Sequence, residues 1–289
     1  MKINTLLKLC AFTVFLGRAY QFYFFGAPFR AILWDESLMG PVVEGLTEYS
    51  WFDYATSPAV NQWIESFTKV NAFIFLLAGI TCLFWEKILN TRIKRTILGI
   101  ALILFLLFGI CILKDKNYNI LQLFELSMQF AAPLLLYFNP GLDSLSNKRN
   151  LLFLKAALAL AFIPHGIFAM GLIFIPGHFL DMTIKILAIN ESQATNFLFV
   201  VGLIDIVFSV LIFIPKISKY VILYLVFWGF ATAIARLVSG YNHNFIMYSF
   251  HNYSYLVIFR LSHGILPLLI YIMEKKLIKQ QLVPSLNEN

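Results

Sequence analysis

Apolar residues in this sequence are gathered into eight runs of roughly 20 residues, separated by short polar segments. A run of that length crosses the hydrocarbon core of a bilayer as one helix, so the pattern predicts an all-α, polytopic membrane helical bundle with about eight transmembrane helices. Within the runs apolar and polar residues do not alternate, which favours helices over membrane strands. We place the helices at 7–26, 70–86, 96–113, 120–138, 151–175, 195–214, 220–239 and 255–273.

Composition agrees with a membrane environment. Of the 289 residues, 60% are hydrophobic and 13% are charged, whereas a soluble domain carries about 25% charged residues. The net charge of +7 could indicate nucleic-acid binding, but the basic residues lie in short segments beside apolar runs, so we expect no nucleic-acid partner. Cys10, Cys82 and Cys111 lie in apolar runs without metal-binding spacing, so neither a disulfide nor a metal site is predicted.

The distribution of Lys and Arg predicts the orientation of the helices. Counted over alternate loops, fourteen lie on one side and five on the other. By the positive-inside rule the first side is cytoplasmic, and an even number of helices places both termini there. We therefore predict a multi-pass protein of the bacterial inner (cytoplasmic) membrane. The N-terminal run contains Arg18 and lacks a small-residue cleavage site, so we predict that it is a retained helix rather than a signal peptide.

The longest segment outside the predicted helices is 27–69, on the predicted outer face. It contains six of the fifteen acidic residues and several Trp and Tyr side chains. Ser57 and Pro58 are typical of a helix N-cap followed by proline in the first turn. We expect a short amphipathic helix at the outer interface or, as the alternative, an ordered loop packed over the bundle. In either case the segment would form a lid. The expected apolar face consists of Val60, Trp63, Ile64 and Phe67.

The two halves of the chain resemble each other. The motif Phe-Glu-Leu-Ser at 124–127 recurs as Phe-Arg-Leu-Ser at 259–262, and each is followed by a Pro-Leu-Leu motif that ends in Tyr. The shared order of motifs predicts two parallel four-helix units, 1–139 and 150–289, related by an axis along the membrane normal.

The run 196–212 carries Gly202 and Asp205 within an apolar helix and is similar to the second helix of DoxX-like four-helix membrane proteins. Arg18, followed by a polar loop, resembles the start of DoxX-like and HTTM (horizontally transferred transmembrane) domains. A doubled unit departs from the DoxX pattern, and Gly79 in the first half is not followed by an acid. The resemblance implies a membrane redox or lipid-facing role. Because some members are linked to quinone-dependent sulfur oxidation, it makes a quinone a candidate cofactor.

Seven ionisable residues lie inside the predicted helices. Each costs about 2.5–3.5 kcal/mol to insert, so such residues usually pair or face a polar cavity. In the predicted topology nearly all of them fall in the outer half of the membrane. They are the candidate ligand-binding residues: Arg18, Glu125, His165, Asp205, Arg236, Arg260 and His263.

These residues have two interpretations. Arg18 is expected to pair with Glu125, and Asp205 with Arg236 or Arg260. The pairs could hold the bundle together without further function, or they could line a cavity for a ligand. Two members also have simpler explanations. Arg236 could extend to the outer surface, and His165, which follows a proline, could form a hydrogen bond with a carbonyl group freed at a helix kink.

We therefore predict an accessory membrane protein of DoxX-like type that binds a quinone, lipid or other amphipathic ligand in a polar pocket of the outer half, beneath 27–69. No catalytic residue is predicted, and the sequence lacks Walker, GxSxG and HExxH motifs. Two alternatives remain: a small-solute transporter, because parallel repeats with charges between them suit alternating access, and an envelope scaffold that anchors a membrane or periplasmic protein partner through 27–69.

Overall fold

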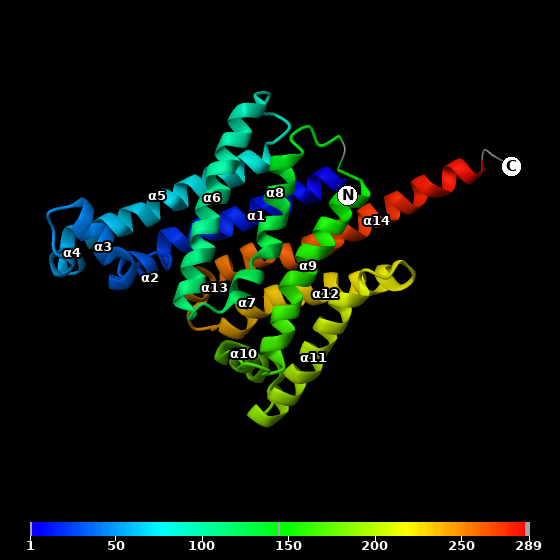
Figure 1. Ribbon diagram of the computed structural model, residues 1–289. Helices are drawn as coiled ribbons and strands as arrows, with labels where there is room; N and C mark the ends of the chain where they lie inside the picture. Colours follow the sequence, from blue (N-terminus) through cyan, green and yellow to red (C-terminus); the bar gives the residue numbers. More distant parts are fainter. Residues whose placement is uncertain (1, 144, 287–289) are drawn as a thin grey trace.

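The computed structural model describes residues 2–143 and 145–286, and this part of the chain is helical throughout, without strands (Figure 1). The helices are α1 (Ile3–Phe24), α2 (Arg30–Leu33), α3 (Glu36–Leu46), α4 (Trp51–Thr56), α5 (Pro58–Leu83), α6 (Thr91–Asp115), α7 (Ile120–Phe124), α8 (Ser127–Phe138), α9 (Lys148–Ala169), α10 (Gly177–Leu187), α11 (Glu191–Leu211), α12 (Pro215–Gly240), α13 (Ile246–Arg260) and α14 (Ser262–Leu286).

Six helical segments among the described residues are long and apolar enough to cross a membrane. They are α5, α6, α9, α11, α12 and the stretch Ile246–Gln280, which joins α13 to α14. The prediction of a multi-pass helical membrane bundle is therefore confirmed. The other two predicted crossings fall on α1, which carries Lys8 and Arg18, and on α7 together with the shorter apolar helix α8.

Successive helices run back and forth between two ends of the bundle. Figure 1 places the N-terminus and the connections after α5, α8 and α11 toward the upper right, where α14 also ends. The connections after α1, α6, α9 and α12 lie toward the lower left, together with α2, α3, α4 and α10. The loops that are rich in Lys and Arg thus gather at the first end, which is called the basic end below.

Aromatic residues fill the interior of the first half, with α1 at its centre. Phe15 and Phe22 of α1 are fully buried against Phe75 of α5 and Phe105 and Phe108 of α6. Ring centroids in this cluster lie 5.1 to 6.4 Å apart. Because α1 also packs against α13 and α14, it is an interior helix. An interior position explains how α1 accommodates charged side chains that a lipid-facing helix would exclude.

Helix contacts in the second half correspond to those in the first. In this correspondence α9 takes the place of α1. α1 packs on α5, and α9 packs on α11. Each of the two also contacts the bent helix pair of the other half: α1 contacts α13 and α14, and α9 contacts α7 and α8. A glycine lies in both of the first contacts: Gly79 of α5 faces α1, and Gly202 of α11 faces α9. A β-carbon on Gly202 would lie 2.6 Å from the carbonyl oxygen of Gly166, so the approach of α11 to α9 requires glycine.

Helix interruptions occur at the recurring motif in both halves. α7 ends at Phe124 and α8 begins at Ser127, whereas α13 ends at Arg260 and α14 begins at Ser262. Both turns are tightened by bonds between residues three apart, from Leu126 N–H to Leu123 O (3.1 Å) and from Gly264 N–H to Leu261 O (3.1 Å). The interruption at residues 125–126 was not expected within 120–138, and its consequence is that Glu125 and Arg260 occupy corresponding bends.

The prediction for 27–69 is partly wrong. The N-cap is confirmed, since the Ser57 hydroxyl accepts the Val60 N–H (3.4 Å) and Pro58 begins the helix. That helix, α5, continues without a break to Leu83, so residues 58–69 are its first turns and not a separate interfacial helix. No proline or glycine follows until Gly79, and nothing in the sequence breaks the helix earlier. The remainder forms α2, α3 and α4.

Candidate ligand-binding site

All seven sequence-predicted residues line three adjoining cavities where the two halves meet. The polar cavity (about 360 Å³) lies between α7, α9, α10 and α13. The central cavity (about 250 Å³) extends from it to Arg18 of α1. The narrow cavity (about 60 Å³) extends toward α11 and α12 and is lined by Asp205 and Arg236. His165 and Arg260 line all three, so the cavities share one wall.

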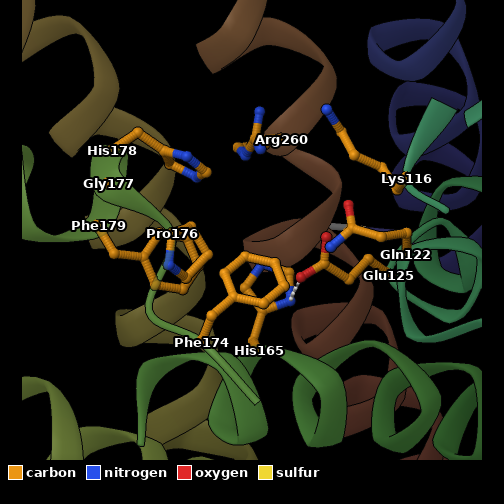
Figure 2. Close-up of a pocket in the computed structure, with 10 residues that line it drawn as sticks. All are labelled: Lys116, Gln122, Glu125, His165, Phe174, Pro176, Gly177, His178, Phe179 and Arg260. Atoms are coloured by element: carbon orange, nitrogen blue, oxygen red, sulfur yellow. Dashed lines mark ion pairs between the residues drawn. The ribbon is translucent and has the colours of Figure 1, made fainter. Parts of the chain in front are cut away.

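Arg260 is the last residue of α13, and its partly buried side chain lines all three cavities. In Figure 2 its guanidinium stands between His178 and Lys116 at the edge of the polar cavity. It forms no ion pair and no side-chain hydrogen bond with any described residue. Its closest aromatic contact is the Phe259 ring, 4.9 Å from the guanidinium carbon to the centroid. Its five N–H donors therefore have no acceptor within hydrogen-bond distance among the described residues, although Gln122 and Glu125 line the same cavity.

Glu125 pairs with His165 rather than with Arg18. The Glu125 carboxylate lies 3.4 Å from His165 Nδ1, as Figure 2 shows, and the same nitrogen lies 3.0 Å from the backbone oxygen of Ala161. Glu125 also lines the cavity that Arg260 faces but forms no ion pair with it. The expected Arg18–Glu125 pair is thus wrong, because the bend between α7 and α8 directs Glu125 toward α9.

Arg18 is buried and held by neutral groups. Its Nε and Nη2 atoms donate to Gln129 Oε1 (2.9 and 2.7 Å), and Nη1 donates to Gln21 Oε1 (2.6 Å). The guanidinium carbon lies 3.9 Å from the centroid of the Phe259 ring and 4.7 Å from that of Phe108, within the range of cation–π attraction. No carboxylate of the described residues forms an ion pair with it, so its charge adds to the positive potential of the central cavity.

Asp205 and Arg236 line the narrow cavity without pairing. One oxygen of the Asp205 carboxyl group, Oδ1, is buried without a hydrogen-bond partner among the described residues, as is Nε of Arg236. The Trp228 side chain is a hydrogen-bond partner of the Asp205 carboxyl group. Arg236 lies over the ring of Phe179 of α10, with 5.8 Å from the guanidinium carbon to the centroid. The expected pairing of Asp205 with an arginine of the second half is therefore wrong.

The three cavities are rich in positive charge. Four basic side chains line them (Arg18, Lys116, Arg236 and Arg260) against two carboxylates, Glu125 and Asp205, which leaves a formal excess of two positive charges. Such an excess in a partly dehydrated site attracts an anion.

Histidines add polar groups to these walls without adding fixed charge. The pKa of His178, at the start of α10, is lowered to about 3 by loss of hydration and then by the positive charges of Arg236 and Arg260. His178 is therefore neutral at physiological pH and presents one donor and one acceptor. His263 is buried, with Nδ1 3.1 Å from the backbone oxygen of Arg260 and its ring 5.8 Å from that of His165.

Several site residues were not identified from sequence. Gln129 and Gln122 are neutral, and Lys116 was counted only as a loop residue that reports topology. His178 lies in the connection between the predicted helices 151–175 and 195–214. In the structure this segment forms α10, and Phe174 and Pro176, just before α10, also line the polar cavity. This segment covers the polar cavity, whereas 27–69 contributes no described residue to the lining of the three cavities. The short apolar pattern of 179–187 was the available signal for α10.

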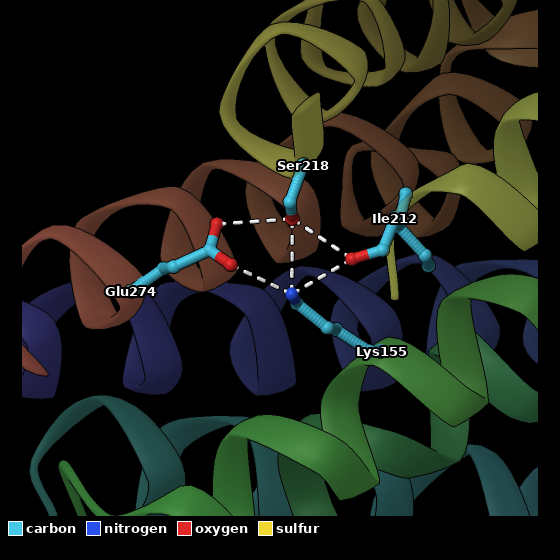
Figure 3. Close-up of polar contacts among 4 residues, drawn as sticks. All are labelled: Lys155, Ile212, Ser218 and Glu274. Carbon is cyan, nitrogen blue, oxygen red and sulfur yellow. Dashed lines mark hydrogen bonds and ion pairs between the residues drawn. The ribbon is translucent and has the colours of Figure 1, made fainter. Parts of the chain in front are cut away.

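A second buried polar cluster lies near the basic end. The ammonium of Lys155 (α9) lies 2.7 Å from Glu274 Oε1 (α14), 2.9 Å from Ser218 Oγ (α12) and 2.8 Å from the backbone oxygen of Ile212, as Figure 3 shows. The Ser218 hydroxyl in turn lies 3.1 Å from Glu274 Oε2. This cluster is not predicted from the sequence. Lys155 enters only the count of basic residues on each side of the membrane, and Glu274 lies one residue beyond the predicted eighth helix.

Comparison with known proteins gives no family: no family model, no curated protein and no solved structure matches the chain. Among the described residues there is also no group of three or more His, Cys, Asp or Glu side chains arranged to hold a metal ion. The chemistry of the cavities is therefore the basis for any assignment of function.

Proposed function

We propose that this protein is a multi-pass membrane protein that binds an amphipathic ligand with an anionic head in the polar and narrow cavities. An acidic lipid fits this description. A quinone has a neutral head whose carbonyl oxygens accept hydrogen bonds, and it is the alternative ligand for the same arginines. The observation that carries the proposal is the pair of arginines without acceptors, Arg236 and Arg260, at the edge of cavities with a positive excess.

The chemistry of arginine favours an oxyanion as the missing partner. A guanidinium presents a planar fork of donors that matches a carboxylate or phosphate group in two parallel hydrogen bonds. A charge held away from water without a partner is destabilising, and a bound anion would remove that penalty. Lys116 and the neutral His178 lie beside Arg260 in Figure 2 and add further donors.

The proposal includes the predicted eight crossings in a bacterial inner membrane, as two parallel four-helix units with both termini cytoplasmic. The corresponding contacts of α1 with α5 and of α9 with α11 support the two units, as do the bends at Glu125 and Arg260. The gathering of basic loops at one end supports the orientation. In this orientation the polar cavity lies in the outer half, because α10, which lines it, is at the end of the bundle opposite the basic end.

Native mass spectrometry of the protein released from a mild detergent tests ligand binding. We expect a co-purified acidic lipid or quinone whose occupancy falls roughly 10- to 100-fold in Arg260→Gln, since hydrogen bonds to a charged group contribute about 1.5–3 kcal/mol. The matched control is Arg92→Gln, which removes an exposed arginine at the basic end and should leave occupancy unchanged. Equal occupancy in both variants, or a protein that is free of ligand in native membranes, would contradict the proposal.

A scaffold function is the second candidate, and it rests on the surface of α3 and α4. Leu46, Tyr49 and Phe52 are exposed by 81%, 65% and 72% beside the acidic residues of this segment. Replacing all three with Ser should abolish co-purification of a protein partner while ligand occupancy is retained. The transporter alternative gains no comparable support. Near the basic end the ammonium of Lys155 uses all three of its donors within the protein, so it leaves no donor for a solute.

A further inference from the structure

An apolar groove of about 180 Å³ lies on the outside of the bundle between α10, α11 and α12. Its lining is almost entirely apolar, and three of its residues, Ile186, Leu187 and Phe197, are exposed by 39%, 45% and 38%. In a membrane such a groove faces the acyl chains of the lipid. The lining residues are Met182, Thr183, Ile186, Leu187, Phe197, Trp228, Ala231, Thr232 and Ala235.

The wall of the groove is continuous with the wall of the cationic cavities. Met182, Trp228 and Thr232 line both the groove and the narrow cavity. The narrow cavity in turn shares Arg260 with the polar cavity and is lined by Arg236. The groove and the narrow cavity, together called the passage below, therefore change from apolar at the outer surface of the bundle to positively charged inside. This polarity matches a molecule with an apolar chain at one end and an anionic group at the other.

The size of the passage limits the molecule that can occupy it. The narrow cavity has a volume of about 60 Å³, and a single water-sized group requires about 10–15 Å³ on this scale. About four to six such groups therefore fit in it. That volume holds a segment of one alkyl chain or a small head group, but not a substituted quinone ring or the branched head of a two-chain phospholipid.

From this continuity we infer that the ligand is a single-chain anionic amphipath, a long-chain carboxylate or phosphate monoester, whose head is bound by Arg236 and Arg260 and whose chain lies in the groove. The inference rests on the proposed function and specifies the class of its ligand. It also assigns α10 a role: Met182 and Phe179 place this helix over the passage, between the head site and the lipid.

Photo-crosslinking with palmitic acid that carries a diazirine at the end of its chain tests the position of the chain. The full-length protein is placed in phosphatidylcholine nanodiscs, and adducts are mapped by peptide mass spectrometry. We expect adducts in the groove segments of α10 and α12, competed by unlabelled palmitate or lysophosphatidic acid but not by cetyl alcohol. The stronger competitor identifies the anion as carboxylate or phosphate. Adducts spread over the lipid-facing helices, or competed equally by cetyl alcohol, would indicate annular lipid only and overturn the inference.

Two substitutions on α12 separate the chain site from the head site. Ala231→Phe fills the groove and should lower the adduct yield at least tenfold, whereas Ile234→Phe, at an exposed position of the same helix outside the groove, should leave it unchanged. Ala235→Phe is the second blocking variant if Ala231→Phe does not fold by size-exclusion chromatography. An unchanged adduct yield in both blocking variants would overturn the inference.

The proposed function is tested independently with butyrate, whose chain is too short to occupy the groove. Thermal stabilisation by butyrate should depend on Arg260 and persist in Ala231→Phe. If butyrate stabilises the protein but palmitate gives no groove adduct, the head site stands and the inference on the chain fails. If neither binds, both fail. If a quinone displaces the diazirine probe and unlabelled palmitate does not, the cavity binds an amphipathic molecule. The inferred class, a single-chain anion, is then wrong.

Discussion

The two buried polar clusters of this protein differ in how many of their hydrogen-bonding groups are used. Near the basic end, the three donors of the Lys155 ammonium meet three acceptors, from Ile212, Ser218 and Glu274. At the opposite end, Arg260 has five donors and no acceptor within the described residues. Both clusters join helices of different parts of the chain. A saturated cluster can only stabilise the fold, whereas an unsaturated cluster beside a cavity can bind a ligand.

The largest expected effect is the loss of stability when the saturated cluster is broken. Glu274→Leu leaves the Lys155 ammonium, whose side chain is 8% exposed, without its counter-charge, and removal of one partner of a buried pair costs about 3–5 kcal/mol. Thermal unfolding in detergent should show a large fall in Tm. The double variant with Lys155→Met should recover most of the loss. A double variant as unstable as Glu274→Leu would mean that packing, and not the pair, supplies the stability.

The opposite sign is expected for the unsaturated cluster. Arg260→Met removes a charge without an acceptor, so the ligand-free protein should gain about 1–3 kcal/mol, the cost of an unsatisfied buried polar group. Binding of the anionic ligand should be lost in the same variant. The measurement is the Tm of delipidated protein with and without added palmitate. A fall in Tm of the ligand-free variant would place Arg260 among the structural residues, and the contrast between the two clusters would disappear.

Arg18 provides an intermediate case, because it is buried and bonded but has no carboxylate partner. A double-mutant cycle between Arg18→Met and Gln129→Leu should give a coupling energy of about 1 kcal/mol, since Gln129 accepts two of its hydrogen bonds. The matched cycle of Arg18→Met with Glu125→Gln should be close to additive. Strong coupling in the second cycle would restore the direct pair expected from the sequence.

These cases show what the sequence could and could not predict. The runs of apolar residues predicted the helical membrane bundle, because burial in lipid requires long apolar helices whatever their neighbours are. The cost of an intramembrane charge singled out the seven residues that line the cavities. Pairing depends on partners that carry no charge signal, such as Gln129 and the carbonyl oxygen of Ile212. It also depends on the bends at 125 and 260, which direct these side chains and follow from tertiary packing.

The cover of the cavity was assigned to the wrong segment for a related reason. The aromatic and acidic composition of 27–69 indicated a lid, but composition does not say which helices a segment packs over at that end of the bundle. In the structure α2 lies beside α6, and Asp35, the N-cap residue of α3, forms an ion pair with Lys114 at the end of α6 (2.6 Å). The actual cover, α10, is only eleven residues long and resembles an ordinary connection in sequence.

The smallest expected effect concerns this Asp35–Lys114 pair. Its side chains are 19% and 22% exposed, against 8% for Lys155, so the pair is less buried than the Lys155 cluster. The hydrogen bond from Lys114, with a second from Ser37, lowers the pKa of Asp35 to about 2. A carboxyl group with a lowered pKa in the folded state contributes stability above its unfolded pKa of about 4, and this contribution is lost as the pH falls toward 2. Asp35→Asn should therefore lower Tm slightly at neutral pH, and the difference from wild type should shrink as the pH falls below about 4. Screening by water and salt keeps the effect far below that of Glu274→Leu. If Asp35→Asn and Glu274→Leu lost equal stability at neutral pH, burial would not be the reason that the Lys155 cluster stabilises the bundle. The saturation of its hydrogen bonds would then be the remaining explanation.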